Sequence, residues 1–144
     1  MPEMAAAGRA LLYQHGPGLG YLATVWRDGG PRVHPTCPFI ADGRLCVFIG
    51  ASPKRADLLR DGRYALHTFP KPDGDDEFFL TGRAALVADA GRRERAYAVY
   101  TAQGTTTGED DPLFELEIER AMLAIYQSRG AAAWPPAYTR WRAP

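Results

Sequence analysis

The sequence contains very little of several residue types, and each scarcity excludes a class of protein. Asparagine is absent, so the 144 residues offer no acceptor for N-linked glycans. Two cysteines are too few for a disulfide framework. No apolar run approaches the roughly 18 residues that a membrane-spanning helix needs, and no basic leader precedes an apolar segment at the N-terminus. These absences predict a cytoplasmic protein with reduced thiols and no membrane partner.

The charge balance argues against a second group of functions. The 17 Lys and Arg residues cancel the 17 Asp and Glu residues, which leaves a formal net charge of zero. Proteins that bind nucleic acid or acidic membranes usually carry an excess of positive charge, so neither partner is expected. The content of 46% hydrophobic and 24% charged residues is ordinary for a globular domain. We therefore expect one domain that spans residues 1–144.

Lysine and serine are also rare, and one of each lies in the same short segment. The basic residues are nearly all arginine, since the only lysines are Lys54 and Lys71. The only serines are Ser52 and Ser128. Ser52 and Lys54 lie two positions apart within GASPKRADLLRDG, residues 50–62. This proximity is a weak indication that the segment has a specific role.

The same segment predicts a short helix over residues 53–61. Ser52 is a favoured N-cap residue, because its hydroxyl can accept a hydrogen bond from the first turn. Pro53 suits the first helical position, where its missing N–H would be unpaired in any case. Gly62 is a typical helix terminator. The caps therefore explain the helix without any ligand.

The charges at the start of this helix suit a bound anion. Lys54 and Arg55 fall in the first turn, where the helix dipole disfavours cations by a few tenths to about 1 kcal/mol each. An anion would reverse that sign, and it could bind the free N–H groups, the Ser52 hydroxyl and the two cations. The residues alone leave two interpretations open, a capped helix and a phosphate cradle.

The rest of the chain alternates short strand patterns with turns. Helices are expected at 3–15 and 91–103, and strands at 21–27, 31–41, 44–50, 64–69, 78–89 and 113–127. Residues 113–127 could instead form an amphipathic helix, but the alternation of Phe114, Leu116 and Ile118 with glutamates favours a strand. Gly82 is a candidate β-bulge, and the aromatic tail is expected to be irregular. About six strands with short helices predict a mainly β, α+β small barrel.

The Asp42-Gly43 turn predicts a hairpin that is apolar on both faces. A sheet with one wet face would alternate apolar and polar residues, so we expect both faces to be covered. One face should fill the barrel and the other should pack on a second copy of the chain, which predicts a homodimer. Cover by the chain's own helices is the alternative. The two faces carry Ile40, Leu45, Val47 and Ile49, and Cys37, Phe39, Cys46 and Phe48.

The order of these segments resembles a known family, the flavin-binding split barrels related to pyridoxamine 5'-phosphate oxidase. The chain runs through LATVWRDGGPRVHPT, the Asp-Gly hairpin, VFIGASPKRADLLRDGRYALH and EFFLTGRAALV. The Ser-x-Lys…Asp-Leu…Arg-Asp pattern after an apolar strand is the most specific part. The likeness covers roughly residues 18–90 and is looser in the last third. It implies a roman-sandal-like, homodimeric split β-barrel with FMN in a groove at the dimer interface.

The resemblance also implies which residues contact the coenzyme. Ser52 and Lys54 would bind the FMN phosphate, with Arg55 nearby. Trp141, on the C-terminal tail, would reach the groove of the partner. No residue is implied as catalytic. Two strand segments would line the isoalloxazine ring: His34, Pro35 and Thr36 on one, and Phe48, Ile49 and Gly50 on the other.

The implied function is an FMN-dependent oxidoreductase that transfers a hydride to or from a small substrate in the dimer groove. Two alternatives stay open: a reductase that uses a deazaflavin coenzyme, and a protein that binds flavin or haem without turnover. The C-terminal Arg and His pattern that holds the substrate phosphate in the oxidase is not recognisable here. Oxidation of pyridoxamine phosphate itself is therefore not expected.

A metal site is not expected. His34 and Cys37 differ by three positions along one predicted strand, so they point to opposite faces and cannot share a zinc ion. The acidic residues of the loop at 71–77 lack the spacing of a calcium loop and are expected to be solvated.

Overall fold

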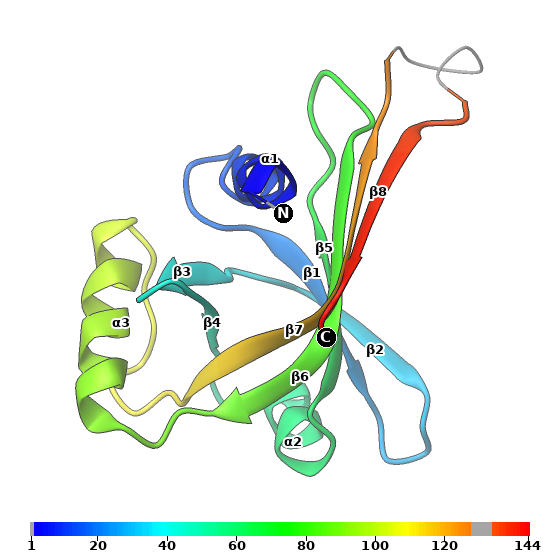
Figure 1. The fold of residues 1–144 in the computed structure, drawn as a ribbon. Coiled ribbons are helices and arrows are strands. Elements are labelled where there is room, and N and C mark those ends of the chain that lie inside the picture. Colours follow the sequence, from blue (N-terminus) through cyan, green and yellow to red (C-terminus); the bar gives the residue numbers. More distant parts are fainter. Residues whose placement is uncertain (1, 128–133) are drawn as a thin grey trace.

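The computed structural model describes residues 2–127 and 134–144 and folds them into one curled antiparallel sheet with three short helices (Figure 1). The sheet order is β2-β1-β5-β6-β7-β4-β3, with β8 paired to β7. The predicted mainly β split barrel is therefore confirmed. The elements are α1 (Pro2–Leu12), β1 (Gly20–Val25), β2 (Pro31–Thr36), β3 (Phe39–Ala41), β4 (Arg44–Phe48), α2 (Pro53–Arg60), β5 (Arg63–Thr68), β6 (Glu77–Leu86), α3 (Ala90–Ala102), β7 (Leu113–Ile125) and β8 (Ala137–Arg142).

Two predictions about individual strands are wrong. The single strand expected at 31–41 is divided into β2 and β3, because the chain leaves the ladder at Cys37 and Pro38. The carbonyl oxygen of Pro38 packs so closely on the N-terminal loop that a Cβ on Gly18 would lie 1.8 Å from it. The tail is also not irregular, since β8 pairs with β7 from Arg120↔Arg142 to Ile125↔Ala137.

The longest strand, β7, organises the sheet. Its residues 114–124 pair with β6, and its other edge is shared between two strands. β4 pairs with residues 113–115 and β8 pairs with residues 120–125. The register with β6 shifts between Thr81 and Gly82, which confirms the predicted bulge. A Cβ on Gly82 would lie 1.8 Å from the carbonyl oxygen of Glu117, so no larger residue fits there.

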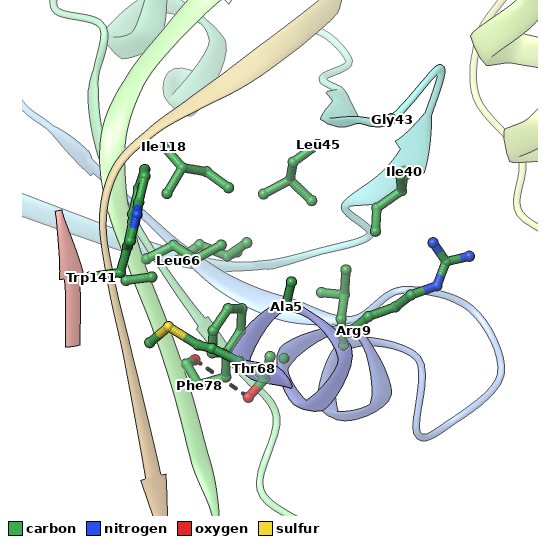
Figure 2. A pocket seen from close by; sticks show the side chains of 15 residues that line it. Ala5, Arg9, Ile40, Gly43, Leu45, Leu66, Thr68, Phe78, Ile118 and Trp141 are labelled. Atoms are coloured by element: carbon green, nitrogen blue, oxygen red, sulfur yellow. Dashed lines mark hydrogen bonds between the residues drawn. The ribbon is translucent and has the colours of Figure 1, made fainter. Parts of the chain in front are cut away.

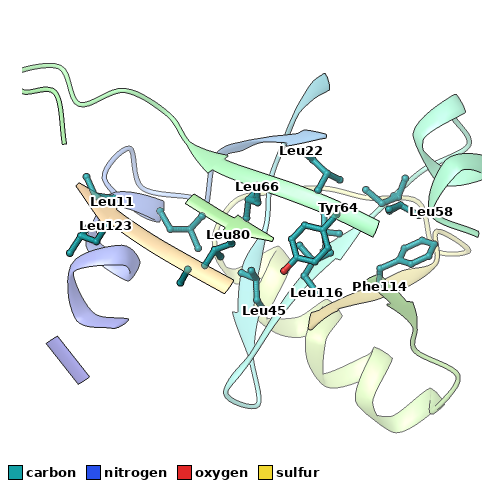
Figure 3. Close-up of a cluster of buried hydrophobic side chains, with 14 of the residues drawn as sticks. Leu11, Leu22, Leu45, Leu58, Tyr64, Leu66, Leu80, Phe114, Leu116 and Leu123 are labelled. Atoms are coloured by element: carbon teal, nitrogen blue, oxygen red, sulfur yellow. The ribbon is translucent and has the colours of Figure 1, made fainter. Parts of the chain in front are cut away.

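The main hydrophobic core fills the inside of the barrel beneath α1 (Figure 3). It joins one face of the β3–β4 hairpin, which carries Leu45 and Val47, to side chains of α1, β1, β5, β6 and β7. Tyr64 reaches across this core and donates a hydrogen bond to the carbonyl oxygen of Glu117 at 3.2 Å. Apolar side chains therefore line the inside of the barrel.

A second core lies on the opposite face of the hairpin and corrects the expectation about a second copy of the chain. Phe39 and Phe48 stack with ring centroids 5.6 Å apart, and Tyr100 of α3 packs on both rings. Ala96 of α3 is also buried in this cluster. The chain's own helix therefore covers this face, so the hairpin supplies no argument for a dimer. Within the described residues, no helix is long and apolar enough to cross a membrane.

Candidate functional site

Strand β2 lies at the edge of the sheet and presents alternate side chains toward α2. Pro31, Val33 and Pro35 are exposed, whereas Arg32, His34 and Thr36 are partly buried. The side chain of Arg32 reaches α2, where its Nε donates a hydrogen bond to Asp57 Oδ2 at 2.7 Å. The period of two in a strand thus places His34 on the same side as Arg32, facing the start of α2.

Asp57 is the buried anchor between α2 and the sheet, and only 3% of its surface is exposed. Its carboxylate accepts hydrogen bonds from Thr24 Oγ1 at 2.8 Å, Arg32 and Arg60. Burial opposes the charged form, but these hydrogen bonds outweigh it and lower the pKa of Asp57. Asp57 belongs to the family pattern Ser-x-Lys…Asp-Leu…Arg-Asp, but its role as an anchor was not predicted. The one indication of that role in the sequence is that Asp57 is the single acidic residue of a helix whose other charged residues are basic.

His34 carries an unsatisfied polar atom beside this anchor. Its ring Nε2 is buried and has no hydrogen-bond partner. Burial lowers the pKa of His34, and the positive charges of Lys54 and Arg32 lower it further. Buried polar atoms are usually paired, so an orphaned one indicates a missing partner. The neutral ring could donate to or accept from a ligand, according to its tautomer.

Polar groups of Ser52 and Lys54 at the start of α2 are available to bind a ligand. Ser52 is the N-cap residue, but its hydroxyl donates to the carbonyl oxygen of Gly50 at 3.0 Å and makes no capping hydrogen bond. The predicted cap is therefore wrong in its contacts. Within residues 2–127 and 134–144, no hydrogen bond or ion pair engages the Lys54 ammonium or its main-chain N–H. The first turn thus presents the ammonium and the main-chain N–H of Lys54, whereas the N–H groups of Arg55 and Ala56 already donate to the Ser52 carbonyl oxygen.

The end of α2 also differs from the prediction. The helix ends at Arg60, and Asp61 follows in an extended conformation with its N–H bonded to the carbonyl oxygen of Asp57. Gly62 does not adopt a positive φ, so it is not the expected left-handed terminator. A Cβ on Gly62 would lie 2.8 Å from the carbonyl oxygen of Ala84. Glycine is required there by the close approach of β6.

The acidic side chain of Asp111 lies next to the start of α2. A Cβ on Gly50 would lie 3.4 Å from a carboxylate oxygen of Asp111, so Gly50 leaves room for this group. The pKa of Asp111 is lowered by hydrogen bonds from Thr107 and from the Gly108 N–H, and by the nearby charge of Arg55. The charge of Arg55 therefore acts on Asp111, but no hydrogen bond or ion pair among the described residues joins the two side chains.

The remaining predicted site residues do not all join this cluster. The side chain of Phe48 is buried under α3 and that of Ile49 is buried inside the barrel. The Ile49 N–H donates to the carbonyl oxygen of Pro112 at 3.2 Å. Trp141 lines a separate cavity beside α1 within the same chain. Contact of Phe48 and Ile49 with a coenzyme would have to come from their main chain, and the reach of Trp141 into a partner's groove stays a prediction.

The residues at β2 and α2 fit the phosphate end of a flavin coenzyme. They offer the ammonium of Lys54, its free main-chain N–H at the helix start and a buried imidazole nitrogen that has no partner among the described residues. No group of three His, Cys, Asp or Glu side chains among the described residues could hold a metal ion. Burial raises the pKa of the Cys46 thiol to about 11, so this cysteine is not a reactive nucleophile at neutral pH.

Comparison with solved structures identifies the fold. A haem-binding protein from Mycobacterium smegmatis superposes with a TM-score of 0.69 at 16% identity, over 95% of this chain and 57% of that one. The present chain thus spans just over half the length of that protein. A pyridoxamine 5'-phosphate oxidase candidate from Listeria innocua superposes with a TM-score of 0.66 at 21% identity, over 84% and 97% of the two chains.

A nimC/nimA family protein from Clostridium acetobutylicum is similar to the same extent, with a TM-score of 0.65 at 20% identity over 96% and 94% of the chains. No family model and no curated protein matches the sequence. The chain therefore has the split-barrel fold of pyridoxamine 5'-phosphate oxidase and its structural relatives. At these identities the likeness defines the fold, and the activity has to be inferred from the site.

Proposed function

We propose that the chain binds FMN with the coenzyme phosphate at the start of α2, and that it acts as an oxidoreductase on a small substrate. One observation carries the proposal: the buried, unpartnered Nε2 of His34 lies on the strand that faces the uncapped, cationic first turn of α2. A helix with this charge arrangement is stabilised by a bound anion.

The residues divide the binding task between them. Lys54 provides the charge for the phosphate, and its main-chain N–H adds a donor at the helix start. The Ser52 hydroxyl can rotate away from the Gly50 carbonyl to meet the ligand. Asp57 holds Arg32 in place, so the positive potential of Arg32 also acts on this region. Bound FMN would supply the hydride-transfer chemistry.

A homodimer is part of the proposal, because a second chain would complete the groove beside β2. Among the described residues no strand pairs with the outer edge of β2, and the strand carries an exposed apolar row in which Val33 is 61% exposed. An exposed edge of this kind favours cover by another chain. Measurement of the mass in solution by light scattering tests this part directly, and a monomer at all concentrations and coenzyme loads would contradict it.

Two alternative ligands share the site. A deazaflavin coenzyme also presents a phosphate to a helix start, and the structural likeness to a haem-binding protein favours haem as a further candidate. Titration of the apoprotein with FMN, the deazaflavin coenzyme and hemin in parallel separates these ligands. Tight binding of FMN, followed by bleaching of the bound flavin with NADPH, is the result expected for the oxidoreductase.

The decisive variant removes both cations of the cradle. Lys54→Ala combined with Arg55→Ala should weaken FMN binding by about 3 kcal/mol, roughly a hundredfold, because a charge-assisted hydrogen bond contributes about 1.5–3 kcal/mol. The titration is followed by the fluorescence of the flavin. Thermal stability should stay nearly constant, since no hydrogen bond or ion pair with a described residue engages the side chain of Lys54 or of Arg55.

A matched control is built into the composition of the chain. Lys71→Ala removes the only other lysine, which pairs with Asp76 at 3.2 Å in the loop before β6. FMN affinity should be unchanged in this variant. Equal affinities for the wild type, the double variant and the control would contradict the phosphate assignment. The segment would then be an ordinary short helix.

A further inference from the structure

A cavity of about 410 Å³ lies between α1, the tip of the β3–β4 hairpin and β8 (Figure 2). Ala5 of α1, Leu45 of β4 and Trp141 of β8 stand on three sides of it. Sites for small organic ligands usually measure about 300–1,000 Å³. The cavity therefore has the size of a binding site for a compact ligand.

The sheet topology explains why this space is not filled. β4 leaves the edge of β7 after Glu115, and β8 joins the same edge only from Arg120 onward. The hairpin and β8 therefore diverge, and Ile118 faces the space between them. α1 crosses the opening but cannot enter it, because Gly8 already packs directly on the ring of Phe78. The cavity therefore results from the paths of β4 and β8 along β7, and not from one small side chain.

The cavity wall is mostly apolar. The Thr68 hydroxyl is already used in a hydrogen bond to the carbonyl oxygen of Phe78. The one charged side chain that lines the cavity is Arg9, and no ion pair with any described residue engages its guanidinium. No carboxylate lines the space. An apolar ligand with a negative end is therefore complementary to this cavity, and a cationic ligand is not.

This cavity is separate from the candidate coenzyme site. Of the ten residues predicted to contact FMN, only Trp141 lines it. Figure 1 shows α1 and α2 well apart, near different parts of the barrel. A ligand in the cavity would therefore leave the start of α2 open.

We propose that this cavity binds a small apolar monocarboxylic acid, with its carbon skeleton against Leu45, Leu66 and Trp141 and its carboxylate paired with Arg9. The apolar part contributes by leaving water, and the single charge sets the orientation of the ligand. This site uses neither the cationic start of α2 nor His34, and Trp141 is the one residue that it shares with the predicted flavin contacts.

The test uses octanoate and its neutral counterpart octanol as probes of the full-length chain. Trp141 reports binding through its indole emission, in a background where Trp26→Phe and Trp134→Phe remove the other two tryptophans. Octanoate should bind with saturation and change the emission of Trp141. Octanol should bind about tenfold more weakly, because it lacks the partner for Arg9.

Two variants with matched controls assign the site. Ala5→Trp should fill the cavity and abolish binding of both probes, whereas Ala6→Trp adds the same bulk at an exposed α1 position outside the lining. Calorimetry follows binding in these two variants, which carry a new indole. Arg9→Gln should weaken octanoate about tenfold and leave octanol unchanged, whereas Arg27→Gln should affect neither probe.

The proposal is overturned if octanoate does not bind, or if it binds equally well to Ala5→Trp. Equal affinities for octanoate and octanol would overturn the role of Arg9 and with it the ligand class. A third outcome is that Ala5→Trp lowers the mass of the protein in solution. The cavity would then be a contact between two copies of the chain, which also overturns the proposal. FMN titration of the same variants separates this result from any failure of the flavin site.

Discussion

Helices α2 and α3 are anchored to the sheet in the same way but differ at their N-terminal ends. Each is held by a buried carboxylate between two arginines. Asp57 accepts from Arg32 and Arg60 beneath α2, and Glu115 of β7 accepts from Arg44 and from Arg92 of α3. Both carboxylates therefore serve the same purpose, which is to fix a helix on the sheet.

The N-terminal ends of the two helices differ in their capping. The Asp89 side chain caps α3 by accepting from the Arg92 N–H at 2.7 Å, and the Arg92 side chain donates to Glu115 at 2.6 Å. At α2 the Ser52 side chain makes no capping hydrogen bond, and Lys54 has no partner within the described residues. Since anchoring is common to both helices, it does not explain this difference. A ligand at the start of α2 does explain it.

The largest expected effect comes from removing an anchor. Asp57→Ala should lower the free energy of unfolding by about 3–5 kcal/mol, because it leaves Arg32 and Arg60 without their buried partner. Glu115→Ala should cost less, about 2–3 kcal/mol, because Arg44 is more than half exposed and water can solvate it. Urea denaturation of the apoprotein measures both values. A cost near zero for either variant would mean that its helix is held by apolar packing alone.

The anchors also predict how stability depends on pH. In the folded chain the pKa values of Asp57 and Glu115 lie below their ordinary values. The stability that they contribute is therefore complete above the unfolded pKa of about 4, and it is lost as the pH falls through the lower folded pKa. The wild type should lose stability steeply below about pH 4, and both alanine variants should lose less over the same range.

A smaller effect separates the two helix ends. Asp89→Ala should destabilise the protein by about 1 kcal/mol, the typical cost of a lost N-cap. Ser52→Ala should cost only a few tenths of that, because the hydroxyl of Ser52 makes no capping hydrogen bond. The same denaturation measurement compares them. Equal losses would show that Ser52 caps α2 in solution, and the contrast between the two ends would disappear.

Local patterns in the sequence predict the parts of this fold that depend on neighbouring residues. The Asp-Gly turn sets the pairing of Phe39 with Cys46, and the alternation around Leu116 places β7 in the sheet. The bulge at Gly82 is also visible as an isolated glycine in a strand pattern. These features rest on periodicity and turn chemistry, which the sequence carries directly.

Features that depend on distant partners were missed. β8 forms because β7 has a free edge at 120–125, and nothing inside the tail itself signals that edge. The cover of Phe48 by α3 depends on where the chain returns after β6, so the sequence-based prediction of a second copy of the chain on this face was wrong. At the site, Lys54 was predicted correctly as a basic residue of the first turn. The closeness of Arg55 to Asp111 and the anchor at Asp57 required the tertiary structure.

The smallest expected effect lies at His34 and tests the difference between the helix ends most directly. Burial and the charges of Lys54 and Arg32 hold the pKa of His34 below its ordinary value. Between that folded pKa and about 6.5, the unfolded chain binds the proton that the folded chain refuses, so stability should fall slightly as the pH drops through this window. An anion at the start of α2 would offset the positive charges and raise the pKa of His34.

NMR titration of the imidazole signals, with and without FMN, measures this shift. His34 should move toward its ordinary pKa when FMN binds, because the phosphate charge compensates Lys54. His15 lies in the loop after α1, outside the candidate site, so its signals should not respond to FMN and serve as the internal control. FMN binding that leaves His34 unchanged would place the phosphate elsewhere. A different anion would then have to account for the unpaired groups of Lys54 at the start of α2.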